Sequence, residues 1–358
     1  YTVTDNVTIG DKIQLTATVS ENSGRTQLNS PANMTVISKN NPLPVVKIVY
    51  DIYNWDLEEY EGMLVEFNQT LWVNNNSRLE AYGELELGVK RKPSPTNLAF
   101  PGSSAYQAMV SENSLQPLYM DDARTDNYVT PIVLADADGT RRTGERVINF
   151  QAIVDYTNGK YVIYPAKFPV TFHGNPRKTV PDESGNYNLK VCAFNLEYYL
   201  TQSFGTGYGP NDQVEANKQH TKIVEALKAI DADIYGLIEI EQGQAALAKL
   251  ANALNNIAGG SKYNYVNDGG TTSGSYTKVG YLYRSDRVSP YSGLVNINSP
   301  SPANRKKIQA FQLNENNERF AFSLNHLKAK SGCPSSGEDA DQGDGQSCFN
   351  ATRTAEAN

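Results

Sequence analysis

Histidine, cysteine and long apolar segments are scarce in this sequence. Its 358 residues include 3 histidines and 3 cysteines. No uninterrupted apolar run approaches the ~20 residues of a membrane-spanning helix, so no membrane span is expected. Basic residues are not in excess either, because 32 Lys and Arg face 39 Asp and Glu, for a net charge of −7. Since nonspecific nucleic-acid affinity comes mostly from clustered Lys and Arg, this balance excludes a generic polyanion binder, and any phosphate site must be local.

The length predicts more than one domain. A single hydrophobic core stops growing at roughly 250 to 300 residues, so a chain of 358 residues has room for two or three domains. The chain begins at Tyr1 without a charged and then apolar leader. We therefore expect that any signal peptide has been removed or lies outside this numbering.

The first ~180 residues carry the pattern of short strands. Residues 10–20 alternate apolar and polar side chains, which predicts a half-buried strand. Asn158-Gly159 separates two alternating runs and predicts a tight hairpin with a primed turn. Residues 91–104 are rich in Pro, Ser and Gly and predict a long loop. We expect OB-like β-barrels, with a segment at 1–58 that need not be complete and a second barrel-like domain at 59–178.

Such barrels often bind single-stranded nucleic acid, and a spacer or docking role is the alternative that we favour. The polar segment 175–188 contains two prolines and predicts a boundary, with the linker at 179–187. From residue 188 onward, predicted strands alternate with amphipathic helices, which indicates an α/β domain at 188–358.

Three polar side chains end predicted strands of this second part. Leu189, Val191 and Ala193 are expected on the inward face of one strand, and Asn195 continues that face. Glu239 closes an apolar strand between two helices, and His326 continues an apolar stripe. A satisfied core polar group is the alternative for any one of them.

Their chemistry suits a phosphate site. A carboxylate with an amide oxygen nearby suits a hard divalent cation that keeps several waters, which is the usual arrangement for magnesium. A histidine with an arginine close by suits a phosphodiester whose negative charge grows in the transition state.

Five short segments follow one another in this part of the chain: "FNLEYY", "ADIYGLIEIE", "KVGYLYR", "NRKKIQAF" and "FSLNHLKAK". Their order resembles the deoxyribonuclease I-like endonuclease/exonuclease/phosphatase superfamily. The resemblance is strongest to secreted bacterial extracellular nucleases, in which a β-barrel module precedes the nuclease domain. It extends to residues 59–67 and 339–357, and so covers nearly the whole chain.

The resemblance implies roles for named residues. Glu239 would be the main magnesium ligand and Asn195 the amide that supports metal and phosphate, while Glu241 is expected to face outward without a role. His326 would contact and stabilise the scissile phosphate. Arg305 would contact phosphate, with a solvated basic face shared with Lys306 and Lys307 as its alternative, and Lys278 is a weaker substrate contact. Mn²⁺ or Ca²⁺ could replace Mg²⁺.

The resemblance also implies a fold and an activity. The fold would be multidomain α+β, an N-terminal OB-like barrel region followed by part of a four-layer α/β/β/α sandwich. The family's later Gly-Asp-x-Asn and Ser-Asp-His motifs do not occur before Asn358, so we expect a fragment of a longer protein. The expected function is a secreted, metal-dependent nuclease that hydrolyses phosphodiester bonds of extracellular DNA, with RNA as an alternative substrate. The alternatives are a phosphoesterase for another phosphate ester, and a noncatalytic surface protein whose barrels bind nucleic acid or glycan.

Cys333 and Cys348 bracket a segment of Gly, Ser and acidic residues. A disulfide there would close a loop of ~15 residues, stabilise the chain by roughly 3 kcal/mol in the chain-entropy model, and indicate an oxidising, extracellular compartment. Two free thiols are one alternative, and a calcium loop formed by the acids between residues 338 and 344 is another. Cys192 is expected to be a small core residue.

Overall fold

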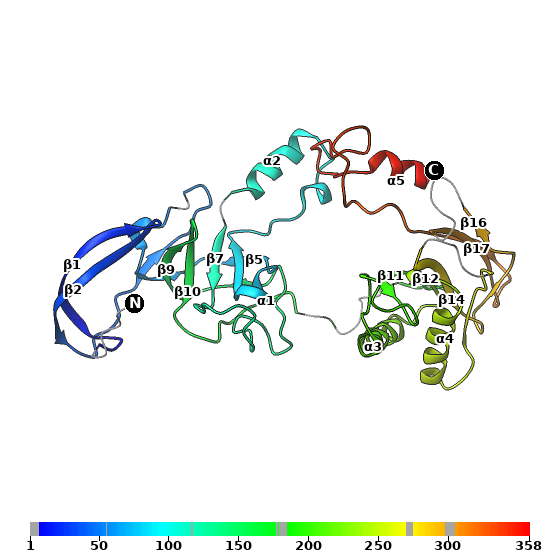
Figure 1. Cartoon of the computed structure of the whole chain (residues 1–358), viewed down its shortest axis with the longest axis horizontal. Coiled ribbons are helices and arrows are strands. Elements are labelled where there is room, and N and C mark those ends of the chain that lie inside the picture. Colours follow the sequence, from blue (N-terminus) through cyan, green and yellow to red (C-terminus); the bar gives the residue numbers. More distant parts are fainter. Residues whose placement is uncertain are drawn as a thin grey trace. The chain divides into compact units, whose positions relative to one another are not determined.

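Two units divide the chain, and each is described by itself. Unit 1 is Tyr1–Arg177 and unit 2 is Lys178–Asn358. The expected linker at 179–187 lies largely outside the described residues, because positions 179–184 are not among them. Helices and several sheets are present, which gives the mixed α and β fold that the sequence predicts (Figure 1). The computed structural model describes residues 7–54, 56–115, 117–176, 178, 185–269, 275–297 and 305–358.

Unit 1 begins with a long two-stranded hairpin. Strands β1 (Lys12–Asn22) and β2 (Arg25–Ser38) pair antiparallel in a sheet of their own. The expectation of a half-buried strand here is wrong, because Val19 is 66% exposed and no residue of either strand is buried. A two-stranded ribbon has no interior of its own, so alternation in the sequence does not bury either face.

An eight-stranded sheet forms the core of unit 1. Its order is β3-β4-β9-β10-β7-β6-β5-β8. The expected closed barrels are not formed by the described strands, because the end strands β3 and β8, of 3 and 2 residues, do not pair with each other. The strands are β3 (Val46–Ile48), β4 (Leu64–Phe67), β5 (Leu71–Asn75), β6 (Glu84–Gly88), β7 (Leu118–Asp121), β8 (Arg146–Val147), β9 (Phe150–Thr157) and β10 (Lys160–Pro165).

In unit 1 the predicted hairpin is present, but one helix was not predicted. The predicted β9–β10 hairpin is confirmed, since Asn158 and Gly159 both have positive φ, 54° and 77°, as a primed turn requires. The α2 helix (Ser104–Asn113) is not predicted by the sequence pattern. It buries one side chain, Tyr106, so it carries almost no apolar stripe. The remaining short helices are η1 (Glu58–Tyr60), α1 (Leu79–Tyr82) and η2 (Pro95–Asn97).

The described residues of unit 2 form two four-stranded sheets and three helices. The first sheet has the order β11-β12-β14-β13, with β11 parallel to β12. In the second sheet β17 pairs with β15, β16 and β18. The elements are β11 (Val191–Tyr199), α3 (Gln213–Ile230), β12 (Ile234–Glu241), α4 (Ala245–Ala258), β13 (Tyr263–Tyr265), β14 (Thr277–Arg284), β15 (Val288–Pro290), β16 (Val295–Asn296), β17 (Lys306–Leu313), β18 (Arg319–Asn325) and α5 (Asn350–Ala357).

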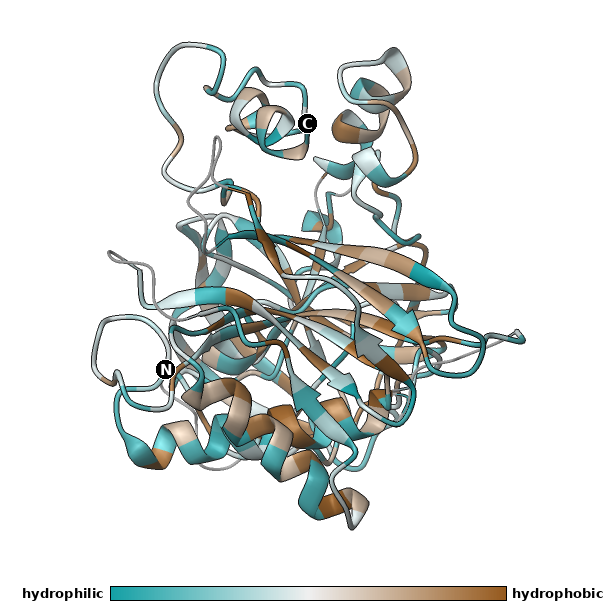
Figure 2. Ribbon diagram, turned by 90° about the vertical axis from the view of Figure 1, so that its right-hand side faces the viewer, coloured by the Kyte–Doolittle hydropathy of each residue, from teal (hydrophilic) through white to brown (hydrophobic). Residues whose placement is uncertain are grey.

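The two faces of β12 belong to different cores. Tyr235 and Leu237 pack with apolar residues of α3 and α4, while Ile234 packs with residues of the second sheet. Gly236 lies on the second face, where an added Cβ would come 2.8 Å from Leu324 Cδ1. A side chain at this position would therefore hold the two sheets apart. Figure 2 shows polar and apolar residues alternating along the helices, as their sequence patterns predict.

The inward face expected for β11 is wrong. Cys192 and Phe194 pack against the core shared with α3, whereas Val191 is 43% exposed and Ala193 is exposed as well. The face that carries Val191 and Asn195 thus remains exposed among the described residues. Asn195 therefore lies on the exposed side of the strand rather than at the end of a buried stripe.

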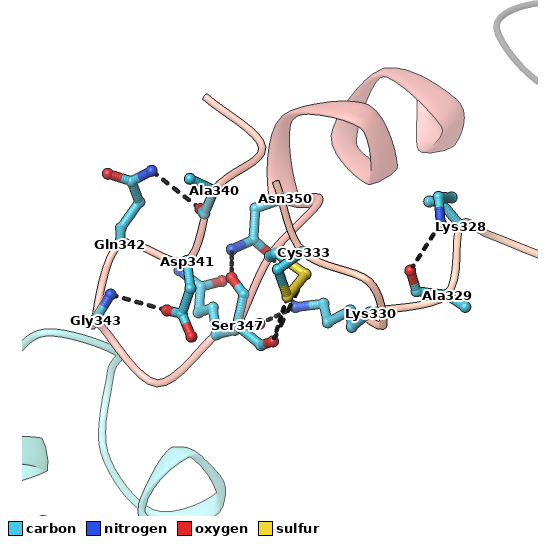
Figure 3. The surroundings of a disulfide bond; sticks show 12 residues. Lys328, Ala329, Lys330, Cys333, Ala340, Asp341, Gln342, Gly343, Ser347 and Asn350 are labelled. Atoms are coloured by element: carbon cyan, nitrogen blue, oxygen red, sulfur yellow. Dashed lines mark hydrogen bonds between the residues drawn. A yellow bond between two sulfur atoms is a disulfide. The ribbon is translucent and has the colours of Figure 1, made fainter. Parts of the chain in front are cut away.

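The predicted disulfide joins Cys333 and Cys348, whose Cα atoms are 5.5 Å apart (Figure 3). It excludes the two free thiols considered above.

The acids of the loop accept hydrogen bonds from nearby backbone: Asp341 from the Gly343 N–H at 2.9 Å and Asp339 from the Thr352 N–H at 2.9 Å. Among the described residues, no three His, Cys, Asp or Glu side chains are grouped to hold a metal. None of the described helices is long and apolar enough to cross a membrane.

Candidate active site

Glu239 lies at a backbone irregularity near the end of β12. Its φ is 61°, in the left-handed region that non-glycine residues seldom occupy. The pairing of β12 with β11 shifts register between Asn195 and Tyr199 of β11. Glu197 and Tyr198, within that interval, also have positive φ, 54° and 53°. Both β11 and β12 therefore depart from regular strand pairing at the same place. Strained backbone of this kind clusters at functional sites.

The Glu239 carboxylate connects the residues that the sequence singled out. Asn195 Nδ2 donates to Glu239 Oε1 at 3.1 Å, and His326 Nε2 lies 3.3 Å from the same oxygen. The Tyr198 backbone N–H donates to Glu239 Oε2 at 3.1 Å. The side chains of His326 and Glu239 are 26% and 14% exposed. The structure therefore brings Asn195, Glu239 and His326 into one network that solvent still reaches.

Arg305 is fixed beside this network. Its Nε and Nη2 donate to the backbone carbonyls of His326 and Leu327, both at 2.9 Å, and the His326 N–H donates to the Arg305 carbonyl at 2.8 Å. Lys306 and Lys307 are each only 4% exposed, so Arg305 does not belong to a solvated basic face with them.

Lys278 belongs to a buried ion cluster. Its Nζ lies 2.7 Å from both carboxylate oxygens of Asp268, and Lys307 donates to the same carboxylate. Burial alone would raise the pKa of Asp268, but the hydrogen bonds from Lys278 and Lys307 lower it. Burial lowers the pKa of Lys278, and Asp268 opposes that shift. With its ammonium held by Asp268, Lys278 contributes a fixed charge to the wall of the site.

A small pocket of about 180 Å³ collects these groups. It holds a carboxylate, an imidazole and a guanidinium within one lining, together with the hydroxyl groups of Ser275 and Thr277. Such a combination suits a tetrahedral anion bound next to a cation. The lining residues are Tyr198, Glu239, Ser275, Thr277, Lys278, Arg305, His326 and Ala329.

The electrostatics favour a neutral His326. Burial and the nearby positive charge of Arg305 lower its pKa, against the opposing effect of Glu239 and Glu356. At neutral pH the imidazole therefore carries one N–H, and its contact with Glu239 is a hydrogen bond. A neutral imidazole still has one N–H that can donate a hydrogen bond to an anion, and the adjacent guanidinium supplies positive charge.

The lowered pKa values of His326 and His220 predict that unit 2 is less stable in acid. The pKa of His220 is also lowered, by burial and by Lys249. Because both folded-state pKa values lie below the ordinary value of 6.5, the unfolded chain binds more protons, and the free energy of unfolding should fall as pH drops below about 6.5. Cys192, the free cysteine, is half-buried in unit 2, so its reaction with a thiol reagent reports the unfolding of that unit.

The measurement is pulsed labelling of Cys192 with an acid-tolerant disulfide reagent during urea titrations at pH 7.5 and 5.5. His326→Asn should flatten the dependence on pH, and His173→Asn, a change at an exposed position in unit 1, should not. A urea midpoint that stays constant or rises toward pH 5.5 would contradict the prediction.

Glu241 differs from its expected outward orientation. It is 5% exposed and accepts hydrogen bonds from the backbone N–H groups of Thr201 at 2.7 Å and Ser203 at 2.8 Å. Burial alone would raise its pKa, but the hydrogen bonds from Thr201 and Ser203 lower it. Glu241 therefore holds the turn after β11 in place.

The sequence pattern does not predict the role of Asp268 either. This residue precedes two glycines, which is typical of a turn.

No family model matches the chain, and no curated protein matches it. Among solved structures, the chain is similar to the human Nocturnin catalytic domain with a bound sulfate anion. The identity is 17% and the TM-score 0.24, over 32% of this chain and 44% of that one. The chain thus spans less than half the length of that neighbour, and a likeness of this extent assigns neither a family nor an activity.

Proposed function

We propose that this chain carries the phosphate- and metal-binding part of a secreted nuclease that hydrolyses phosphodiester bonds in DNA. The observation that supports this most directly is the Glu239 carboxylate, which contacts both Asn195 and His326 in a pocket that also holds Arg305. Unit 2 would then be the first half of a four-layer sandwich. The Cys333–Cys348 disulfide supports secretion, because disulfides persist in oxidising compartments.

The Glu239 carboxylate leaves room for one cation contact. A carboxylate offers about four acceptor positions. Among the described donors, Asn195 and His326 use Oε1, while Tyr198 uses Oε2, so Oε2 keeps a position free. A hard cation that retains several waters needs only one or two carboxylates, which fits Mg²⁺, with Mn²⁺ or Ca²⁺ as substitutes. Asn195 turns its nitrogen toward Glu239, so we propose it as a positioning residue rather than a direct ligand.

The remaining groups act on the phosphate. A bound cation would polarise a phosphoryl oxygen and offset its growing charge. On substrate binding, the single N–H of the neutral His326 imidazole would turn from Glu239 Oε1 to a phosphate oxygen, and the Arg305 guanidinium adds a fixed positive charge. Asn195 and the Tyr198 N–H keep the Glu239 carboxylate aimed into the pocket. The base that takes the proton from the attacking water is assigned to none of these residues.

The test is His326→Ala in the full-length protein, with plasmid DNA cleavage measured over a range of magnesium concentrations. Turnover should fall by about 10²-fold, the usual scale for deleting one transition-state hydrogen-bond donor. The magnesium concentration for half-maximal rate should change little, because Glu239 remains. His173→Ala, at an exposed position in unit 1, is the matched control and should cleave normally. Unchanged cleavage by His326→Ala would leave the histidine as a core residue and remove the main support for the proposal.

A further inference from the structure

An open hollow of about 820 Å³ lies between the segment that follows β11 and the first turns of α3. Asn195 and Tyr198 line it, and Tyr198 also lines the pocket that contains Glu239. Tyr198 thus lines both the hollow and the candidate active site, so the two lie next to each other. A polymeric substrate with its phosphate at Glu239 would extend into this space.

Two stacked tyrosines form one wall of the hollow. The rings of Tyr198 and Tyr208 have centroids 4.9 Å apart and an interplanar angle of 14°. Tyr208 is 57% exposed, so one face of the pair is open to solvent. Exposed aromatic faces of this kind bind nucleobases by stacking, with little preference for sequence because every base has a π-face.

The backbone holds this aromatic pair in place. Gly209 has a φ of +66°, and an added Cβ would lie 2.6 Å from the Tyr198 carbonyl oxygen. Only glycine therefore allows the two segments to approach as closely as the stacking requires. From α3, Gln219 Nε2 donates to the Glu197 carbonyl at 2.9 Å, which supports the left-handed backbone at Glu197 and Tyr198. The platform is preorganised before any ligand binds.

The charges around the hollow point to base recognition more than to phosphate binding. Lys218 and Lys222 stand one turn apart on the exposed face of α3, but Glu197 and Glu215 also line the hollow. Glu215 accepts hydrogen bonds from the N–H and side chain of Asn211, at 2.8 and 3.1 Å. With two lysines facing two glutamates, stacking on the tyrosines is the stronger attraction for a nucleic acid.

We propose that the Tyr198–Tyr208 platform binds an unpaired nucleobase of the strand being cleaved, so that the substrate is single-stranded or locally unpaired nucleic acid. This inference rests on the proposed nuclease function, since it places the base beside the phosphate at Glu239. In a regular duplex the bases stack on one another, so a base reaches Tyr208 only when it leaves the stack.

The experiment measures binding without cleavage, by fluorescence anisotropy of a labelled single-stranded oligonucleotide in EDTA. Tyr208→Ala should weaken binding on the order of 10-fold, the scale of one lost base stack. Tyr208→Phe keeps the ring and should bind close to wild type. An oligonucleotide with 2-aminopurine at the contacted position should lose fluorescence on binding to wild type and not on binding to Tyr208→Ala.

Abasic oligonucleotides separate stacking from backbone contacts. Removing the base at the contacted position should weaken wild-type binding and abolish the difference between wild type and Tyr208→Ala. Equal binding of Tyr208→Ala and wild type to the intact strand would overturn the inference. So would an equal penalty on intact and abasic strands at every position, or binding to duplex as tight as to single strand. If the full-length wild type cleaved no DNA at any magnesium concentration while Tyr208→Ala still lost binding, the nuclease assignment would fail and the platform would stand.

Discussion

Glu239→Gln should lower DNA cleavage by the full-length protein by orders of magnitude. The amide keeps the shape of the side chain, but it removes the negative charge that would hold a hard cation. Its single oxygen can accept a hydrogen bond from Asn195 or from the Tyr198 N–H, but not from both. Activity should recover only in part at high magnesium concentration, because weaker metal binding is compensated by mass action while the altered charge in the pocket is not. The measurement is the initial rate of plasmid nicking as a function of magnesium.

The control for Glu239→Gln is Glu225→Gln, the same chemical change on the exposed face of α3. Glu225 lies 3.6 Å from Lys228 with both side chains largely in solvent, so this variant should cleave at the wild-type rate. Both variants should show the wild-type urea midpoint by Cys192 labelling. A Glu239→Gln protein that is folded and cleaves normally would refute the metal-binding role.

Local pattern explains which parts of the fold were predictable. The Asn158-Gly159 turn was predictable because only certain residues accept positive φ at both positions. The burial of α4 was predictable from its apolar spacing, with Leu247, Leu250 and Leu254 all buried. The exposed hairpin and the open face of β11 were not, because alternation shows which residues share a face but not whether another layer covers it.

The sequence predicts which side chains meet at the candidate site, but not the groups that hold them in place. Glu239 and His326 follow both the strand patterns and the motif order, whereas Asn195 follows the motif order alone, because the inward face predicted for its strand is wrong. The structure places all three side chains in one network. Tyr198 contributes through its backbone N–H, which is available only because the chain takes a left-handed conformation there. No periodicity encodes such a contact. Asp268 was missed for a related reason, since its partners lie 10 and 39 residues away in the sequence.

Asp268 sits between two buried cations. The side chains of Lys278, Lys307 and Asp268 are 1%, 5% and 3% exposed. Gln244 Nε2 also donates to the Asp268 carboxylate. Removing one partner of a buried ion pair costs more than the pair contributes, because the charge left behind is neither hydrated nor compensated. Here the Asp268 carboxylate compensates the charge of two ammonium groups, those of Lys278 and Lys307.

Asp268→Ala should therefore lower the free energy of unfolding of unit 2 by about 3–5 kcal/mol, measured by Cys192 labelling in urea. The loss should shrink between pH 7 and 9. Without the carboxylate, burial lowers the pKa of Lys278 further below its unfolded value, so the unfolded chain binds more protons and stability rises with pH. Asp286→Ala, which breaks an exposed pair with Arg284, is the matched control and should change stability far less. If the two variants unfolded at the same urea concentration, the buried cluster would not stabilise unit 2, and its assignment as the support of the candidate site would be wrong.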